Sequence, residues 1–133
     1  MRKLKKGRTS ISWSRAPDIN QRVVSLFAKL DNPLHISARV FCFRSSYAKT
    51  RAIARIWGFA KIWQLALDEK PAYIIEVISE KFDSLPPKKQ DEVLLHEIAH
   101  IPNNFSGALV PHIRRGKRNF SDKVKQLIKW TSI

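Results

Sequence analysis

The sequence predicts an α+β fold, in which a small antiparallel or mixed sheet packs with flanking helices. Segments with a helical spacing of apolar residues occur beside runs that are rich in β-branched and aromatic residues. The chain has 133 residues, of which 44% are hydrophobic and 27% charged, as expected for one hydrophobic core. We therefore expect a basic, disordered arm over residues 1–10 and a single compact domain over residues 11–133.

The first half of this domain begins with a helix and a strand. Asp18 is a plausible cap for a helix over residues 18–30, whose apolar positions recur with helical spacing. The run LHISARVFCFR, residues 34–44, alternates in the manner of a strand. A polar and basic loop is predicted over residues 45–52.

Two extended runs follow and predict a β-hairpin. Its strands are expected at roughly residues 60–67 and 72–79, joined by a turn-like segment that ends in Pro71. Gly58 marks a bulge or a break before the hairpin. We expect the strand at 72–79 to offer an exposed edge to which an extended peptide can add.

The second half of the domain is dominated by a helix. It is predicted to begin at Pro87, where proline is tolerated, and to run to Ile101, just before Pro102. Residues 102–118 read as a loop, and a final helix follows from residues 119–121 onward.

The charge of the chain is unusual, because 25 Lys and Arg residues against 11 acids give a net charge of +14. Such a charge attracts polyanions and makes nucleic acid a possible partner, although the sequence has no zinc finger or Gly-rich phosphate loop. No apolar run approaches the length of a membrane span, and the N-terminal region lacks the apolar core of a secretory signal. With one cysteine, Cys42, no internal disulfide can form, so we expect a cytoplasmic protein without membrane contact.

The sequence His96-Glu97-Ile98-Ala99-His100 is an H-E-x-x-H motif within the predicted helix. Histidines four residues apart lie on one helix face and can bind one Zn²⁺ together. Glu97 follows the first ligand directly, so its carboxylate would lie beside the metal and could accept a proton from an attacking water. The motif therefore indicates metal-assisted hydrolysis.

A catalytic zinc site needs a third protein ligand. His112 lies 12 residues after His100 and is the preferred candidate, and Asp122, which is the only acid after Glu97, is the alternative. His35 is expected to pack or face solvent on a strand, and Cys42 is expected to be a core thiol. The sequence does not identify the group that stabilises the oxyanion, for which Tyr47, Tyr73 and Arg114 are candidates.

Residues 96–112, HEIAHIPNNFSGALVPH, resemble the metallopeptidase family found in archaea and phages, whose members pair H-E-x-x-H with F-S-G-x-L-x-x-H. The second block runs from Phe105 to His112, and the resemblance covers residues 56–112. It implies a compact zincin-like fold, one Zn²⁺ held by His96, His100 and His112, and Glu97 as the general base.

A looser resemblance is to SprT-like or Spartan-type proteases, which digest proteins crosslinked to DNA. Their usual histidine-glycine-proline block is missing, because Ile113 and Arg114 follow His112. Three hypotheses therefore compete: a zinc metallopeptidase that acts on proteins or peptides, a nucleic-acid-associated basic protein with or without such activity, and a non-catalytic interaction domain that zinc stabilises.

Overall fold

The structure is a computed structural model that describes residues 10–30, 39–112 and 120–131. Its described residues form an α+β arrangement, which confirms the predicted fold class. The elements in chain order are β1 (Ser12–Arg15), α1 (Pro17–Lys29), β2 (Val40–Ser46), β3 (Ala54–Trp57), α2 (Lys61–Leu67), β4 (Tyr73–Ile78), α3 (Ser79–Phe82), α4 (Pro87–Ile98) and α5 (Phe120–Thr131). Residues 1–9 of the predicted basic arm lie outside the described residues.

The four strands form one mixed sheet in the order β1-β2-β4-β3. The central pair, β2 and β4, is parallel, and the outer strands β1 and β3 pair antiparallel with their neighbours. Cys42 of β2 and Ile56 of β3 are both in register with Ile75 of β4. Because β4 lies between β2 and β3, it is not at an edge; the two edge strands of the sheet are β1 and β3.

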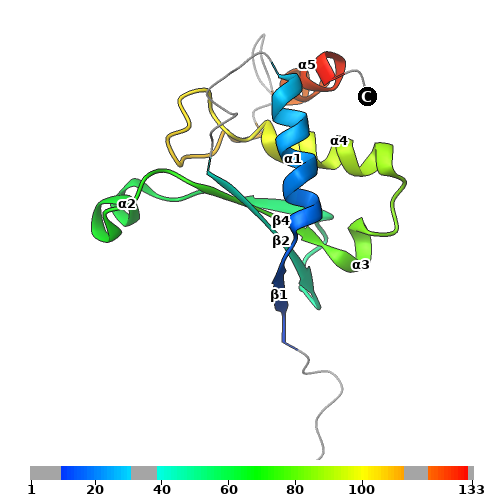
Figure 1. Cartoon of the computed structure of the whole chain (residues 1–133), viewed down its shortest axis with the longest axis horizontal. Helices are drawn as coiled ribbons and strands as arrows, with labels where there is room; N and C mark the ends of the chain where they lie inside the picture. The colour runs from blue at the N-terminus through cyan, green and yellow to red at the C-terminus, as the bar shows by residue number, and fades with distance from the viewer. Residues whose placement is uncertain (1–9, 31–38, 113–119, 132–133) are drawn as a thin grey trace, which may run out of the picture.

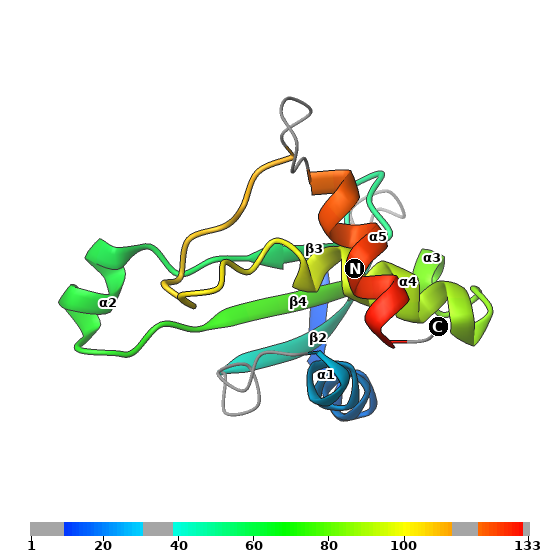
Figure 2. The same cartoon turned by 90° about the horizontal axis from the view of Figure 1, so that it is seen from above.

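Helices α1, α4 and α5 lie on one side of this sheet, so the fold has two layers (Figures 1 and 2). The core lies between them, where the inward residues of the strands meet the apolar faces of α1 and α4. Its fully enclosed side chains include Ile19, Val23, Tyr73, Ile75, Val77, Leu94, Leu95 and Ile98. Full burial of a large aliphatic side chain contributes on the order of 1.5–3 kcal/mol, so this layer contact holds α4 in place.

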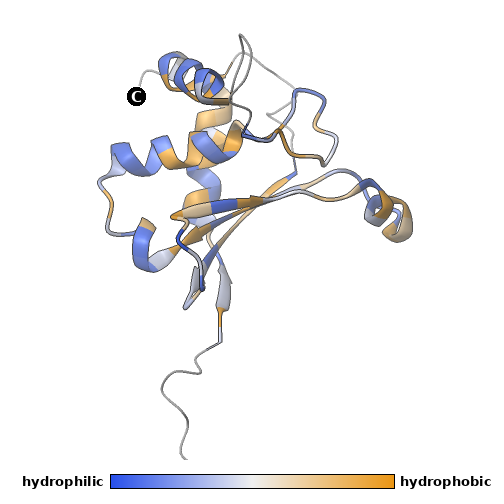
Figure 3. Cartoon of the chain, turned by 180° about the vertical axis from the view of Figure 1, so that it is seen from behind, coloured by the Kyte–Doolittle hydropathy of each residue, from blue (hydrophilic) through white to orange (hydrophobic). Residues whose placement is uncertain are grey.

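The predicted hairpin is wrong in its first strand, because residues 61–67 form helix α2 rather than a strand. The strand that pairs with β4 is β3, which ends at Trp57, four residues before α2 begins at Lys61. The chain leaves the sheet at Gly58, which agrees with the predicted break. Asp68 ends α2 in the left-handed conformation. Helix α2 lies beyond the ends of β3 and β4 and is coloured largely as hydrophobic in Figure 3. Its exposed hydrophobic residues are Ile62, Trp63, Leu65 and Leu67.

Three further boundaries differ from the predictions. Strand β1 was not expected, because four residues of the sequence SWSR give too short a pattern to recognise. Strand β2 continues to Ser46, inside the predicted loop, and residues 34–38 of the predicted strand lie outside the described residues. Helix α4 ends at Ile98, three residues before the predicted end. Helix α5 lies where a final helix was predicted, and α1 lies within one residue of its predicted bounds. The predicted cap at Asp18 is wrong, because Ala16 is the N-cap and Asp18 lies inside the first turn. The short helix α3 was not predicted.

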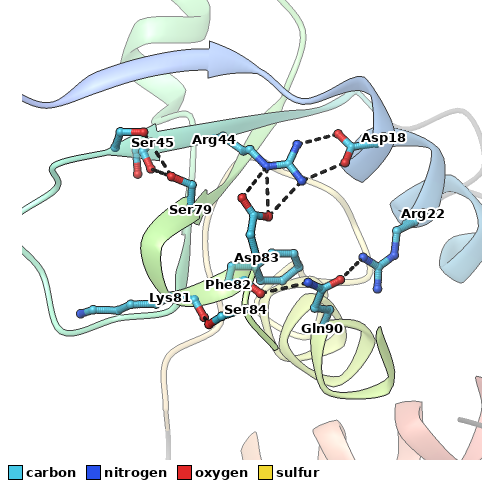
Figure 4. Close-up of polar contacts among 11 residues, drawn as sticks. Asp18, Arg22, Arg44, Ser45, Ser79, Lys81, Phe82, Asp83, Ser84 and Gln90 are labelled. Atoms are coloured by element: carbon cyan, nitrogen blue, oxygen red, sulfur yellow. Dashed lines mark hydrogen bonds and ion pairs between the residues drawn. The ribbon is translucent and has the colours of Figure 1, made fainter. Parts of the chain in front are cut away.

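Polar contacts with α1 and with the segment after β4 also fix the position of α4 (Figure 4). Arg22 of α1 donates to Gln90 at 2.6 Å and to the Asp91 carboxylate at 2.5 Å, and both partners lie on α4. Gln90 in turn donates to the carbonyl oxygen of Phe82 at 2.9 Å. On the same side of the sheet, Arg44 of β2 bridges two carboxylates, from Asp18 and Asp83. The helix that carries the H-E-x-x-H motif is thus tied to α1 and to the segment after β4.

Candidate metal centre

Three histidine side chains converge beside the end of α4. His96 lies in the last turn of the helix, His100 lies two residues beyond it, and His112 lies at the end of the following loop. One ring nitrogen from each lies within 4.8 Å of the others. The Nε2 atoms of His96 and His112 are 3.2 Å apart. The structure therefore brings together the three histidines that the sequence singled out.

The H-E-x-x-H segment keeps its helical geometry although the regular helix ends inside it. The backbone N–H of Ala99 still bonds to Leu95, but His100 and Ile101 form tighter bonds to residues three positions earlier. Pro102 follows at once and cannot continue a helix. Because the chain tightens rather than unwinds, the rings of His96 and His100 stay on one face, with centroids 5.5 Å apart.

A backbone carbonyl orients the ring of His100. Its Nδ1 is 2.5 Å from the carbonyl oxygen of Val110, and the N–H of Val110 donates back to the His100 carbonyl at 2.7 Å. The carbonyl oxygen can only accept, so Nδ1 carries the proton and Nε2 keeps its lone pair. A histidine that donates its second N–H to a carbonyl in this way has the orientation typical of a metal ligand.

The cluster fits a tetrahedral metal ion. Nitrogen ligands of Zn²⁺ at 2.0–2.1 Å would lie about 3.3–3.4 Å apart, and the two Nε2 atoms of His96 and His112 are 3.2 Å apart. Burial, followed by the charges of neighbouring histidines, lowers the pKa of His96. Burial also lowers the pKa of His100, against the hydrogen bond to Val110. Both effects favour neutral imidazoles, which is the form that binds metals.

Glu97 lies between the two helical histidines in sequence and is 7% exposed. Burial raises the pKa of its carboxyl group to about 8. The same residue lines the cleft that contains the three histidines. A cation nearby would favour the carboxylate form, so the protonation of Glu97 depends strongly on what binds at the histidines.

The loop that ends in His112 is held by buried polar contacts. The Tyr73 hydroxyl accepts from the N–H of Gly107 and donates to the carbonyl of Ala108, both at 2.8 Å. The amide of Gln64 donates to the carbonyls of Phe59 and Ser106, at 2.7 and 2.9 Å. These contacts attach the loop to β4 and to the start of α2, and so define the path that leads to His112.

Two residues of the F-S-G segment explain its shape. Phe105 packs edge-on against Tyr73 with ring centroids 4.8 Å apart. Gly107 has φ +96°, and a Cβ atom there would lie 2.3 Å from the carbonyl oxygen of Phe59. Glycine is required because a side chain would suffer both backbone strain and a clash with backbone.

Phe120 is a site residue that the sequence did not reveal. It is the first residue of α5, and its ring stacks on His100 with centroids 4.2 Å apart. The same ring makes edge contacts with His96 and His112, at 4.9 and 4.6 Å. No local pattern marks it, because an apolar residue at a helix start has many roles and its neighbours come from residues 96–112.

The histidines open into a cleft of about 840 Å³. One wall is the edge of the sheet, from Arg51 through β3 to Ile56, and the other is formed by α4 and α5. The predicted exposed edge at residues 72–79 is wrong, because β4 is covered by β2 and β3. The free edge at the cleft belongs to β3, which occupies the outer position because β4 pairs in parallel with β2.

The remaining candidates lie elsewhere. Cys42 is a core thiol, 1% exposed, as predicted. Asp122 lies on α5 and is not part of the histidine cluster. Tyr47 is exposed and does not line the cleft, and the Tyr73 hydroxyl is engaged by the loop backbone. His35 and Arg114 lie outside the described residues.

A mixed sheet, a helix that carries H-E-x-x-H and a third histidine in an open cleft define the class of site as a candidate metal centre with three histidine ligands. The chain belongs to the family described as "Putative phage metallopeptidase", whose model matches residues 11–129. No curated protein and no solved structure matches the chain significantly. Among the helices of the described residues, none has the length and apolar character needed to cross a membrane.

Proposed function

We propose that the chain is a zinc-dependent metallopeptidase in which His96, His100 and His112 bind one Zn²⁺ and Glu97 is the general base. The observation that carries this proposal is the convergence of three ring nitrogens within 4.8 Å beside a buried carboxyl group. A set of three histidines suits zinc and leaves a fourth position open. A Zn²⁺ ion held there would act as a Lewis acid toward a peptide carbonyl and toward water.

Glu97 would perform the proton transfers. Its carboxylate would take a proton from the attacking water and later give it to the leaving amine. Burial supports this role, since it raises the pKa of the Glu97 carboxyl group to about 8. A pKa near neutral pH suits a group that must first accept a proton and then donate it. The apolar walls of the cleft, which include Val93, Val124 and Ile128, would limit the access of bulk water.

An extended peptide would bind along the free edge of β3. This edge forms the wall opposite the histidines, so a strand added to it would cross the cleft. Main-chain hydrogen bonds to a sheet edge hold a peptide without demanding a particular sequence. The proposed substrate class is therefore an unfolded or extended segment of protein.

The test combines metal content with hydrolysis of an unfolded protein substrate. We expect about one zinc per wild-type chain, a clear loss of zinc in His112→Ala, and retained zinc without hydrolysis in Glu97→Gln. Asp91→Asn is the matched control, because it makes the same kind of change on α4 at a residue paired with Arg22 outside the cleft. It should keep both zinc and activity.

Two results would contradict the proposal. Hydrolysis retained by Glu97→Gln would exclude Glu97 as the base. A wild-type protein that binds zinc but cleaves no unfolded substrate, and whose stability depends on zinc, would favour a non-catalytic domain that the metal stabilises.

A further inference from the structure

The sheet has a second face, opposite α1, α4 and α5, on which aromatic residues are exposed. The register of the strands places Trp57 of β3, Ile74 of β4 and Phe41 of β2 in one row across this face. They are 47%, 38% and 38% exposed. Trp13 of β1 pairs with Ser45 of β2, which lies on the same face as Phe41, two rows further along the strand. Trp13 is 54% exposed.

Arginines stand in the row between these aromatic residues. The guanidinium of Arg15 lies 5.2 Å from the ring centroid of Phe43, and that of Arg55 lies 5.1 Å from the ring of Trp57. Strand geometry separates successive rows by about 7 Å, so cations and exposed rings are close neighbours. Flat rings beside arginines suit a ligand that has both aromatic and anionic groups.

The acid on this face does not oppose such a ligand. Glu76 lies beside Arg55 in the same row and is fully buried. It accepts from Arg55 and from the Trp57 indole, both at 2.8 Å. Burial alone would raise its pKa, but the hydrogen bonds, led by that from Arg55, together outweigh burial and hold the pKa below its ordinary value. The ion pair neutralises Glu76 and fixes the plane of the Arg55 guanidinium against Trp57.

The overall charge complements the same kind of ligand. The chain carries a net charge of +14, and five of residues 2–8 are Lys or Arg, directly before β1. A protein partner would not require such an excess of positive charge. A double-stranded nucleic acid would match the charge, but its bases are stacked on one another and their faces are not available to the rings. Single-stranded nucleic acid presents unstacked bases together with a regular series of phosphates, which aromatic platforms with cationic surroundings bind without sequence preference.

We propose that the open face of the sheet binds single-stranded nucleic acid, with bases stacked on Trp13, Phe41 and Trp57 and phosphates near Arg15 and Arg55. The chemistry involved, base rings and phosphates, is common to DNA and RNA. Arg55 also lines the histidine cleft, but Trp13, Phe41 and Trp57 do not. Substitutions at these three rings therefore test nucleic-acid binding apart from the proposed peptidase activity.

The test measures binding of fluorescein-labelled 20-nucleotide oligo(dT) and oligo(rU) by fluorescence anisotropy across a salt series. Removal of one stacking ring should weaken binding by about 5-fold or more, and the double variant Trp13→Ala/Phe41→Ala by about 25-fold or more. Trp13→Phe keeps a ring and should bind nearly as wild type. Binding should also weaken steadily with salt, as phosphate contacts require.

Trp63→Ala is the matched control. Trp63 lies on α2, beyond the ends of the strands, and is 58% exposed, close to the 54% of Trp13. Its removal should change the affinity less than twofold. Circular dichroism and thermal unfolding check that each variant is folded, and neither Trp13 nor Phe41 is buried, so both substitutions should be tolerated.

Several outcomes would overturn the proposal. They are the absence of binding at low salt, binding that does not respond to salt, tighter binding to the duplex of the same length, and a folded double variant that binds as tightly as Trp63→Ala. Binding to vesicles of anionic phospholipid that is lost in the double variant, without oligonucleotide binding, would instead identify the face as a membrane-contact surface.

Discussion

Replacing Gly107 by alanine tests how the third histidine is positioned. The residue has φ +96°, which costs a non-glycine residue on the order of 1–3 kcal/mol. The added Cβ would also lie 2.3 Å from the Phe59 carbonyl oxygen and 2.4 Å from the Gln64 amide nitrogen. Overpacking of this kind costs a further ~1–3 kcal/mol. We expect Gly107→Ala to lower the free energy of unfolding by about 2–6 kcal/mol in total.

The assay is urea and thermal unfolding of the metal-free protein, followed by zinc affinity from competition with a chelator. If the loop delivers His112 to the metal, the zinc affinity of the folded variant should fall by about 10- to 100-fold, as for other groups that orient ligands. Ser106→Ala is the neighbouring control, because it removes a long 3.3 Å bond from the N–H of Ala108 and a contact with the Tyr73 hydroxyl, without backbone strain, and should cost about 1 kcal/mol. A Gly107→Ala protein with wild-type stability and wild-type zinc affinity would refute the reasoning.

Three other predictions follow from single contacts. Tyr73→Phe leaves the N–H of Gly107 without its buried acceptor and should lower the free energy of unfolding by about 1–3 kcal/mol, measured by urea unfolding. Hydrogen bonding to Arg44 lowers the pKa of Asp18 from its ordinary value. This pair therefore stabilises the fold above the ordinary pKa of an aspartate, and the stabilisation is lost as the pH falls through the lowered folded-state pKa. The difference in stability between wild type and Arg44→Met should therefore shrink in acid. Burial, aided by the charge of Asp18, raises the pKa of Cys42 to about 12, so its reaction with a thiol reagent should be slow in native protein and fast in urea.

Local sequence patterns were sufficient to predict the elements that rely on local forces. Helices α1 and α4 were predicted from the helical spacing of their apolar residues and from the proline at or near their start. The H-E-x-x-H motif places two histidines on one helix face independently of the rest of the fold. The position of β2 was also recognisable from its alternation. The fold class followed from these segments, and the structure confirms it.

The elements that were predicted wrongly make contacts with residues far away in the sequence. The sequence KIWQLAL suits a strand or a helix, and the buried residue of helix α2, Gln64, bonds to the carbonyl of Ser106, 42 residues away. The position of β3 at the sheet edge depends on the parallel pairing of β2 with β4. Neither contact leaves a pattern in the segment concerned, so local periodicity could not distinguish the alternatives.

The same distinction applies to the candidate site. Two of its histidines are brought together by helix geometry, while the third reaches them only because Tyr73, Gln64 and Gly107 hold the intervening loop. Substitutions at these three positions should therefore weaken metal binding, although none of the three residues is a metal ligand. The spacing of the F-S-G segment suggested His112 but contained no information on Phe120, whose ring contacts all three histidines from a different helix.

Strand β3 connects the two proposed binding surfaces. Its free edge forms a wall of the cleft, while Arg55 and Trp57 project onto the open face of the sheet. A peptide would approach along the edge and a nucleic acid from the face, so one ligand need not displace the other. The Arg55–Glu76–Trp57 cluster lies between them. Because this buried ion pair holds β3 to β4, breaking it should disturb both surfaces together, whereas changes at Trp13 should disturb only the open face.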